Sequence, residues 1–144
     1  MVGQLVACQY DEGEGLERKL SWYVSKVVNI LSWNDKKKAF EPSGLRAIAY
    51  VEDEERDLDE LYRIAVHIYP ESDEASTNLA NMRAFSLLWQ LGRNRKPKKI
   101  RVDNVPLSSV FFYIQHAYKM NETVFMKDEE LARLVSLFEE KKKR

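Results

Sequence analysis

The chain has 144 residues, and its 23 acidic and 23 basic side chains give a formal net charge of zero. A hydrophobic content of 44%, with five glycines and four prolines, excludes a disordered, collagen-like or repeat-built chain. The single cysteine, Cys8, excludes an intramolecular disulfide bond and a cysteine-based zinc site. We therefore expect one globular domain over residues 1–144, in the reducing environment of the cytoplasm.

Membrane and export signals are not found in the sequence. No apolar run approaches the roughly 18 residues that a membrane-spanning helix needs. Residues 1–15 lack the basic start of a signal peptide and become acidic within eleven residues. We expect an intracellular protein that has no membrane partner.

The first strong periodic pattern covers residues 15–33, after a segment (residues 1–10) that fits either a strand or the edge of a helix. Spacings of three and four predict an amphipathic helix here. The apolar residues at these spacings are Leu16, Leu20, Tyr23, Val24, Val27, Ile30 and Leu31.

Residues 45–69 allow two interpretations. The short apolar run 45–51 and the strict alternation over 62–69 favour two strands, paired as a hairpin whose tip is the acidic stretch 52–60. Residues 58–69 also fit a helical stripe. Pro70 ends the element in either case.

The second half of the chain predicts three more helices and two short strands. Helices are predicted over 71–92, where Gly92 suits the position after the last turn, over 103–120 and over 127–144. Residues 98–102 and 122–126 are typical of short strands. The fold class expected is α+β, a small antiparallel sheet packed by three to four helices; the alternative, if 45–69 are helical, is an all-α bundle.

The charges are unevenly distributed along the chain. Residues 1–74 carry 16 acids and 9 bases, whereas residues 75–144 carry 7 acids and 14 bases. From residue 75 to residue 102 there is no acid. Such a basic strip suits phosphate groups, whose neutralisation releases counterions. The candidate nucleic-acid-binding residues are Arg83, Arg93, Arg95, Lys96, Lys98, Lys99 and Arg101.

Catalytic and cofactor motifs are missing. The sequence has no glycine-rich phosphate loop, no H-E-x-x-H and no C-x-x-C. His67 and His116 could form the acid–base pair of a metal-free nuclease, and the carboxylates of Asp57, Asp59 and Glu60 could hold a divalent cation. Isolated histidines and acidic turns are more often structural, so we predict no catalytic residue, no metal and no cofactor.

Aromatic residues suggest two further kinds of contact. Trp89, Phe112 and Tyr113 could stack on bases if the target is single-stranded, with the basic tail 141–144 as an added contact. Trp22 and Trp33 lie off the main stripe of the first predicted helix and could form a protein interface.

The sequence as a whole predicts a non-catalytic nucleic-acid-binding or accessory subunit of a larger nucleoprotein assembly. Its partners would be the DNA or RNA backbone, together with other protein subunits or a second copy of the chain. One alternative is a protein–protein adaptor whose basic strip meets an acidic partner or the chain's own residues 52–60. A second alternative is a small nuclease.

Overall fold

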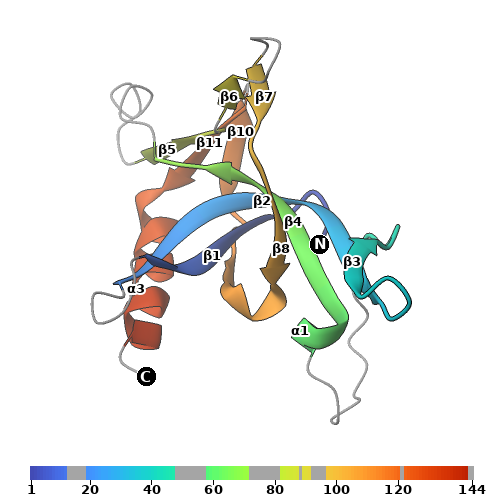
Figure 1. Cartoon of the computed structure of the whole chain (residues 1–144). Helices are drawn as coiled ribbons and strands as arrows, with labels where there is room; N and C mark the ends of the chain where they lie inside the picture. The colour runs from blue at the N-terminus through green and yellow to red at the C-terminus, as the bar shows by residue number, and fades with distance from the viewer. Residues whose placement is uncertain are drawn as a thin grey trace.

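The computed structural model describes residues 1–12, 19–47, 58–71, 82–87, 89–91, 97–120 and 122–142 (Figure 1). Strands predominate in this part of the chain. The helical elements described are α1 (Leu58–Leu61), the 3₁₀ turn η2 (Leu107–Ser109) and the C-terminal helix α3 (Asp128–Lys142).

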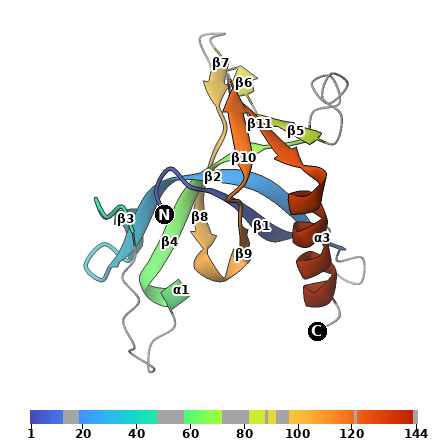
Figure 2. The same ribbon diagram turned by 180° about the vertical axis from the view of Figure 1, so that it is seen from behind.

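The larger sheet is antiparallel and has six described strands. The order across it is β8 (Arg101–Pro106), β4 (Tyr62–Tyr69), β2 (Lys19–Asn34), β1 (Leu5–Glu12) and β9 (Val110–Tyr113), and β3 (Ala39–Pro42) pairs with the end of β2. The two edge strands β8 and β9 are joined only by η2, so the sheet curves to bring its edges together (Figure 2).

A smaller sheet lies against the larger one. It contains β10 (Ala117–Met120), β11 (Thr123–Lys127) and β5 (Met82–Ser86) in that order. A separate pair, β6 (Trp89–Leu91) and β7 (Pro97–Lys99), projects from the top of the molecule in both ribbon views (Figures 1 and 2). Because β7 leads directly into β8, this hairpin connects to the edge of the larger sheet.

Two hydrophobic clusters hold these layers. One lies between the two sheets and α3, and the other fills the opposite, inner side of the larger sheet. The first cluster contains Ala7, Val24, Tyr69, Phe85, Leu87, Ile114, Val124, Met126 and Leu134. The second contains Val6, Cys8, Val27, Ile30, Ile64, Val66 and Val105. The larger sheet is therefore buried on both faces over part of its area.

The predicted fold class is wrong, because the described chain is mostly antiparallel sheet rather than a small sheet packed by three to four helices or an all-α bundle. The clearest error is the first predicted helix, which is the 16-residue strand β2. Val24 packs on one face of β2 and Val27 on the other. A bulge between Val27 and Asn29 then shifts the alternation by one residue. Because β2 is buried on both faces and contains a bulge, its apolar residues fall at spacings of three and four, as those of an amphipathic helix do.

The second and third predicted helices are also wrong. In the 71–92 segment the described residues form β5 and β6, while residues 72–81 lie outside the described part of the chain. The 103–120 segment contains most of β8, then η2, β9 and β10. Its apolar residues are divided between the two hydrophobic clusters: Ile114 belongs to the first and Val105 to the second.

Three predicted elements are confirmed. Helix α3 has three acids in its first turn and two lysines in its last, the order that the helix dipole favours. The alternating segment is strand β4, and the predicted strand at 122–126 is β11. The predicted pairing of β4 with residues 45–51 is not confirmed. Strand β4 pairs with β2 and β8, residues 45–47 are not in a strand, and residues 48–51 lie outside the described chain. No helix among the described residues is long and apolar enough to cross a membrane.

Candidate nucleic-acid interface

The predicted basic strip is only partly described. Arg93, Arg95 and Lys96 lie outside the described residues, and Lys98 lies in β7 without a described side chain. Lys99 ends β7 and Arg101 begins β8, and both are exposed. The end of the strip therefore lies where the projecting hairpin joins the larger sheet.

Arg101 belongs to a row of basic side chains across three strands. Lys26 of β2 lies directly opposite His67 of β4, which in turn lies opposite Arg101 of β8. Side chains at directly opposed positions of antiparallel strands share a face, with Cβ atoms about 5 Å apart. Two positions further along the same two strands, Val24 lies opposite Tyr69, and both belong to the hydrophobic cluster between the sheets. The basic row thus lies at the border of the contact between the two sheets.

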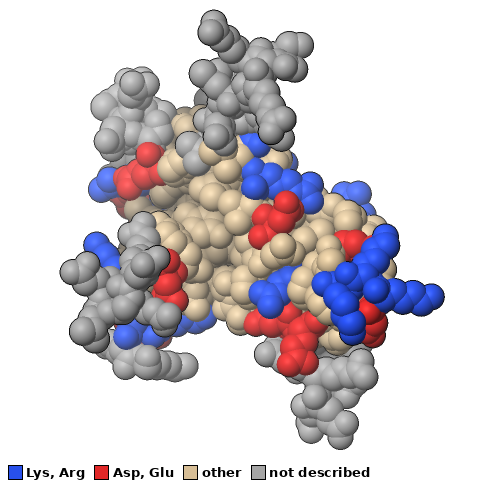
Figure 3. Space-filling view, viewed as in Figure 1, with Lys and Arg blue, Asp and Glu red and all other residues tan. Residues whose placement is uncertain are grey.

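The smaller sheet adds a cation to this row. The side chain of Lys119 on β10 lies close enough to that of Lys26 for each to shift the pKa of the other. Glu122, in the turn between β10 and β11, accepts an ion pair from Lys99 at 3.6 Å. We call Lys26, His67, Lys99, Arg101 and Lys119 the inter-sheet cluster. In Figure 3, Lys and Arg atoms gather below the grey atoms at the top of the view, over the junction of β7 and β8, with acidic atoms beneath them.

Contacts within the cluster shift the pKa values of its members. Burial lowers the pKa of His67, and the cations of Lys99, Arg101 and Lys26 lower it further, against the opposing charge of Glu122. The contact with Lys119 lowers the pKa of Lys26, with burial and the like charge of Lys119 adding to the effect. Burial acts to lower the pKa of Lys119, but the contact with Lys26 and the neighbouring Tyr69 and Glu122 outweigh it and raise this pKa.

Two carboxylates neutralise part of the cluster. Besides the Lys99–Glu122 pair, the Nε of Arg101 donates to Asp103 at 2.7 Å. The second carboxylate oxygen of Glu122 is buried and accepts no hydrogen bond. The charge of Glu122 also attracts Lys26 and Lys119, which face each other. A bound anion between these two lysines would relieve their repulsion.

An aromatic hollow adjoins the cluster. It has a volume of about 690 Å³, and its walls include Trp22, Tyr23, Tyr69 and Phe85. Tyr69 is two residues beyond His67 on β4, and Val102, next to Arg101, also lines the hollow. Mostly apolar hollows of this size accept flat organic groups, while polar groups at the border orient them.

The other predicted site residues lie elsewhere. Arg83, on β5, is paired with Glu71 at 2.8 Å. His116 lines a separate hollow at the start of α3, whose walls do not include His67, so the two histidines form no pair. A carboxylate oxygen of Asp59 accepts the backbone N–H of Ser108 at 3.0 Å, and Asp57 is outside the described residues. Among the residues that the structure describes, no group of three or more potential ligands could hold a metal ion.

The predicted stacking residues are not at the cluster. Phe112 packs against the hydrophobic cluster between the sheets, and the side chain of Trp89 is not described. Tyr113 is 43% exposed but lies on β9, at the opposite edge of the sheet from β8. Sequence reasoning missed Lys26, His67 and Lys119 as members of a basic site, because strand register brings them together.

The fold and this cluster define an antiparallel β protein with a cationic face at the junction of two sheets. Comparisons of the chain with protein-family models, with curated proteins and with solved structures each find no match. The site's own geometry is therefore the basis of the functional argument.

Proposed function

We propose that this protein is a non-catalytic nucleic-acid-binding or accessory subunit of a nucleoprotein assembly, and that it binds phosphates through the inter-sheet cluster. The observation that carries the proposal is the row of Lys26, His67 and Arg101 on three paired strands, with Lys119 of the other sheet beside Lys26. Two lysines from different sheets face each other, beside His67 and Arg101, in an arrangement that a phosphate would stabilise. Lys99 connects this site to the predicted strip at 93–101.

A polynucleotide suits the surroundings of the cluster better than a small inorganic anion does. The basic row continues into the projecting hairpin on one side, and the aromatic hollow adjoins it on the other. Phosphates of a chain would follow the cations, while bases or sugars would reach the apolar surface. Association with other subunits and a cytoplasmic location are parts of the same proposal. The latter is supported by the single cysteine, which is buried and has no partner cysteine in the chain.

The proposal is tested by fluorescence anisotropy of labelled oligonucleotides, single- and double-stranded, at about 50 and about 200 mM salt. We expect affinity to fall by orders of magnitude over this range. The slope of log affinity against log salt should decrease by about one for each cluster cation that contacts a phosphate and is replaced by glutamine. The variant combines Lys26→Gln, Lys99→Gln, Arg101→Gln and Lys119→Gln.

The matched control removes four exposed cations outside the cluster: Lys19, Arg83, Lys127 and Arg133, each changed to Gln. This control should keep most of the affinity. No binding at the lower salt, or an equal loss in both variants, would overturn the proposal and favour an adaptor for an acidic protein. Incubated oligonucleotides should stay intact, since cleavage that His67→Ala abolishes would indicate a nuclease instead.

A further inference from the structure

We infer that the nucleic acid is single-stranded and that it runs from the inter-sheet cluster to the β2–β3 hairpin, where Trp33 stacks on an unpaired base. This inference rests on the proposed function and adds the class of nucleic acid and a second contact. Its basis is the face of the larger sheet that the two regions share, and the way in which the hairpin is built.

Strand β4 connects the two regions. Arg63 and His67 are four residues apart on β4, whose own alternation is regular, so they share a face and lie about 13 Å apart. The Arg63 guanidinium lies over the ring of Phe40 on β3, 5.3 Å from its centre. A cation and an aromatic ring therefore continue the face that begins at His67.

Trp33 stands at the end of this path. It lies directly opposite Phe40, and the two rings are 5.1 Å apart in an edge-to-face arrangement. The indole Nε1 donates to Asp35 at 2.7 Å, which satisfies its polar atom and fixes the ring. Trp33 is still 38% exposed. A fixed, partly exposed indole offers a stacking surface at a low entropic cost.

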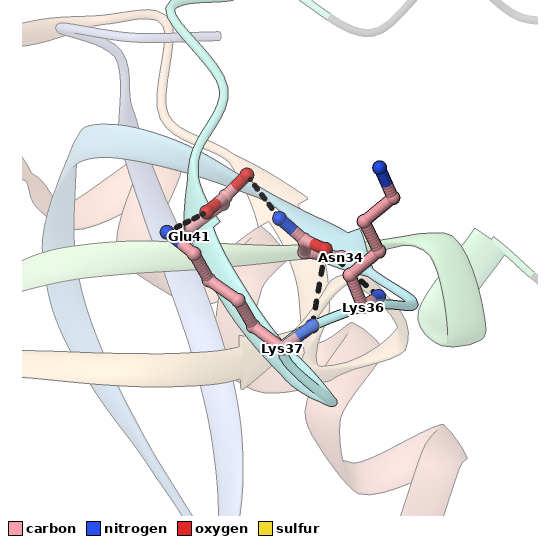
Figure 4. Close-up of polar contacts among 4 residues, drawn as sticks. All are labelled: Asn34, Lys36, Lys37 and Glu41. Carbon is pink, nitrogen blue, oxygen red and sulfur yellow. Dashed lines mark hydrogen bonds and ion pairs between the residues drawn. The ribbon is translucent and has the colours of Figure 1, made fainter.

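The turn beside Trp33 is held in one conformation (Figure 4). The side-chain oxygen of Asn34 accepts the backbone N–H groups of Lys36 and Lys37 at 3.0 and 3.2 Å, and its amide donates to Glu41 at 2.9 Å. Lys38 has a positive φ of 54°, which closes the turn. In Figure 4 the Lys36 side chain points away from Glu41, and it is exposed, so this carboxylate does not neutralise its ammonium group.

The geometry favours a single strand over a duplex. Bases in a duplex stack on one another and cannot stack on a side chain without being unpaired. Lys26 and Trp33 are seven residues apart on β2, or about 23 Å. A single strand of about 4 to 16 nucleotides covers such a distance, the range over which comparable β-sheet surfaces bind.

The test compares single-stranded and double-stranded oligonucleotides of about 12 nucleotides with wild type, Trp33→Ala and Trp33→Phe. Trp33→Ala should weaken single-strand binding between about fivefold and about a hundredfold, and leave duplex binding unchanged. Trp33→Phe keeps a ring for stacking and for packing on Phe40, so it should lose less. Single-strand binding should quench tryptophan fluorescence in wild type, and this quenching should shrink in both variants.

The control is Tyr113→Ala, which removes an aromatic side chain of similar exposure from β9, a strand that pairs with none of β2, β3 and β4. It should leave both affinities unchanged. If the cluster variant abolishes binding but Trp33→Ala binds single strands like wild type, this inference is overturned and the proposed function stands. If no oligonucleotide binds, both are overturned. A loss in Tyr113→Ala equal to that in Trp33→Ala would also contradict it, since stacking would then occur on β9.

Discussion

The inter-sheet cluster and the tip of the β2–β3 hairpin both carry several lysines, but they hold them in opposite ways. In the cluster, Lys26 and Lys119 come from different sheets and face each other. At the hairpin tip, Lys37 is four residues from Glu41 and paired with it at 3.5 Å, and the same carboxylate group accepts the Asn34 amide (Figure 4). The cluster keeps two lysines in contact although its outer cations are paired with carboxylates, whereas the hairpin pairs Lys37 with a carboxylate of its own.

This difference separates a basic surface from an anion site. Repulsion between facing cations destabilises the free protein. An anion bound between them removes this repulsion, and the free energy gained adds to the binding affinity. A lysine already paired with a carboxylate gains little, because the anion must compete with the existing partner. The number of lysines in a region therefore does not predict anion binding well. Whether those lysines are already paired with carboxylates predicts it better. On this argument the hairpin contributes through Trp33 more than through Lys37.

The largest effect should come from Lys26→Gln, which removes the repulsion and the site together, because the lowered pKa of Lys26 shows that the fold disfavours its charge. We expect nucleic-acid affinity to fall about tenfold or more, the value of one charge-assisted hydrogen bond. The melting temperature of the free protein should rise by about 1 to 2 °C, because the like-charge contact is lost. Anisotropy and thermal unfolding measured on the same preparations check both. Changes of the same sign in affinity and stability would show that Lys26 is structural.

A smaller effect should appear in the pH dependence, through His67. Burial and three neighbouring cations lower its pKa in the free protein. The free protein therefore has this contribution to its stability above the unfolded-state pKa of about 6.5, and loses it as pH falls through the lowered folded-state pKa. A bound phosphate raises the pKa of His67 again, so binding takes up a proton.

Affinity should consequently rise severalfold as pH falls from about 7.5 to about 5.5, while the free protein becomes less stable. Anisotropy across this range, beside thermal unfolding, measures both trends. His67→Gln should remove the pH dependence of binding. His116→Gln should leave it in place, since the chain's other histidine lines a hollow away from the cluster. Affinity that is independent of pH in wild type would contradict a phosphate next to His67.

The fold was predictable only where an element's pattern depends on one buried face. Helix α3 buries Leu134 and Phe138, while its first and last turns carry the charges that its own dipole favours. All of this is local, and the prediction is confirmed. Val135, the neighbour of Leu134 in the sequence, is 36% exposed, because α3 buries only a narrow face.

Strand β2 shows why the rest was not predictable. Its β-branched and aromatic residues favour a strand, yet two hydrophobic clusters and a bulge place apolar residues at helical spacings. Periodicity identifies a strand only when one face is polar. The central strand of a sheet packed on both sides lacks that signal.

The candidate site divides in the same way. Lys99 and Arg101 were found because they belong to a basic run without acids, which is visible in the sequence. Lys26 and Lys119 are isolated lysines in apolar segments, and only the packing of the two sheets brings them together. Arg83 belonged to the same run but is paired with Glu71, which lies twelve positions earlier. Charge counting along the chain cannot include a partner that tertiary structure supplies.

The smallest effect should come from Lys37→Gln, the counterpart of Lys26→Gln at the hairpin tip. Its ion pair with Glu41 is exposed, and exposed pairs contribute little to stability. The melting temperature should fall, by less than about 1 °C, and affinity should change less than about twofold. Lys36→Gln, at the neighbouring position whose side chain points away from Glu41, serves as the matched comparison and should lose more affinity. The sign of the stability change is the sharper test, since neutralising a lysine should stabilise the protein at the cluster and destabilise it at the hairpin. If Lys37→Gln weakens binding as strongly as Lys26→Gln, then local neutralisation does not decide which lysines bind, and the distinction between the two regions fails.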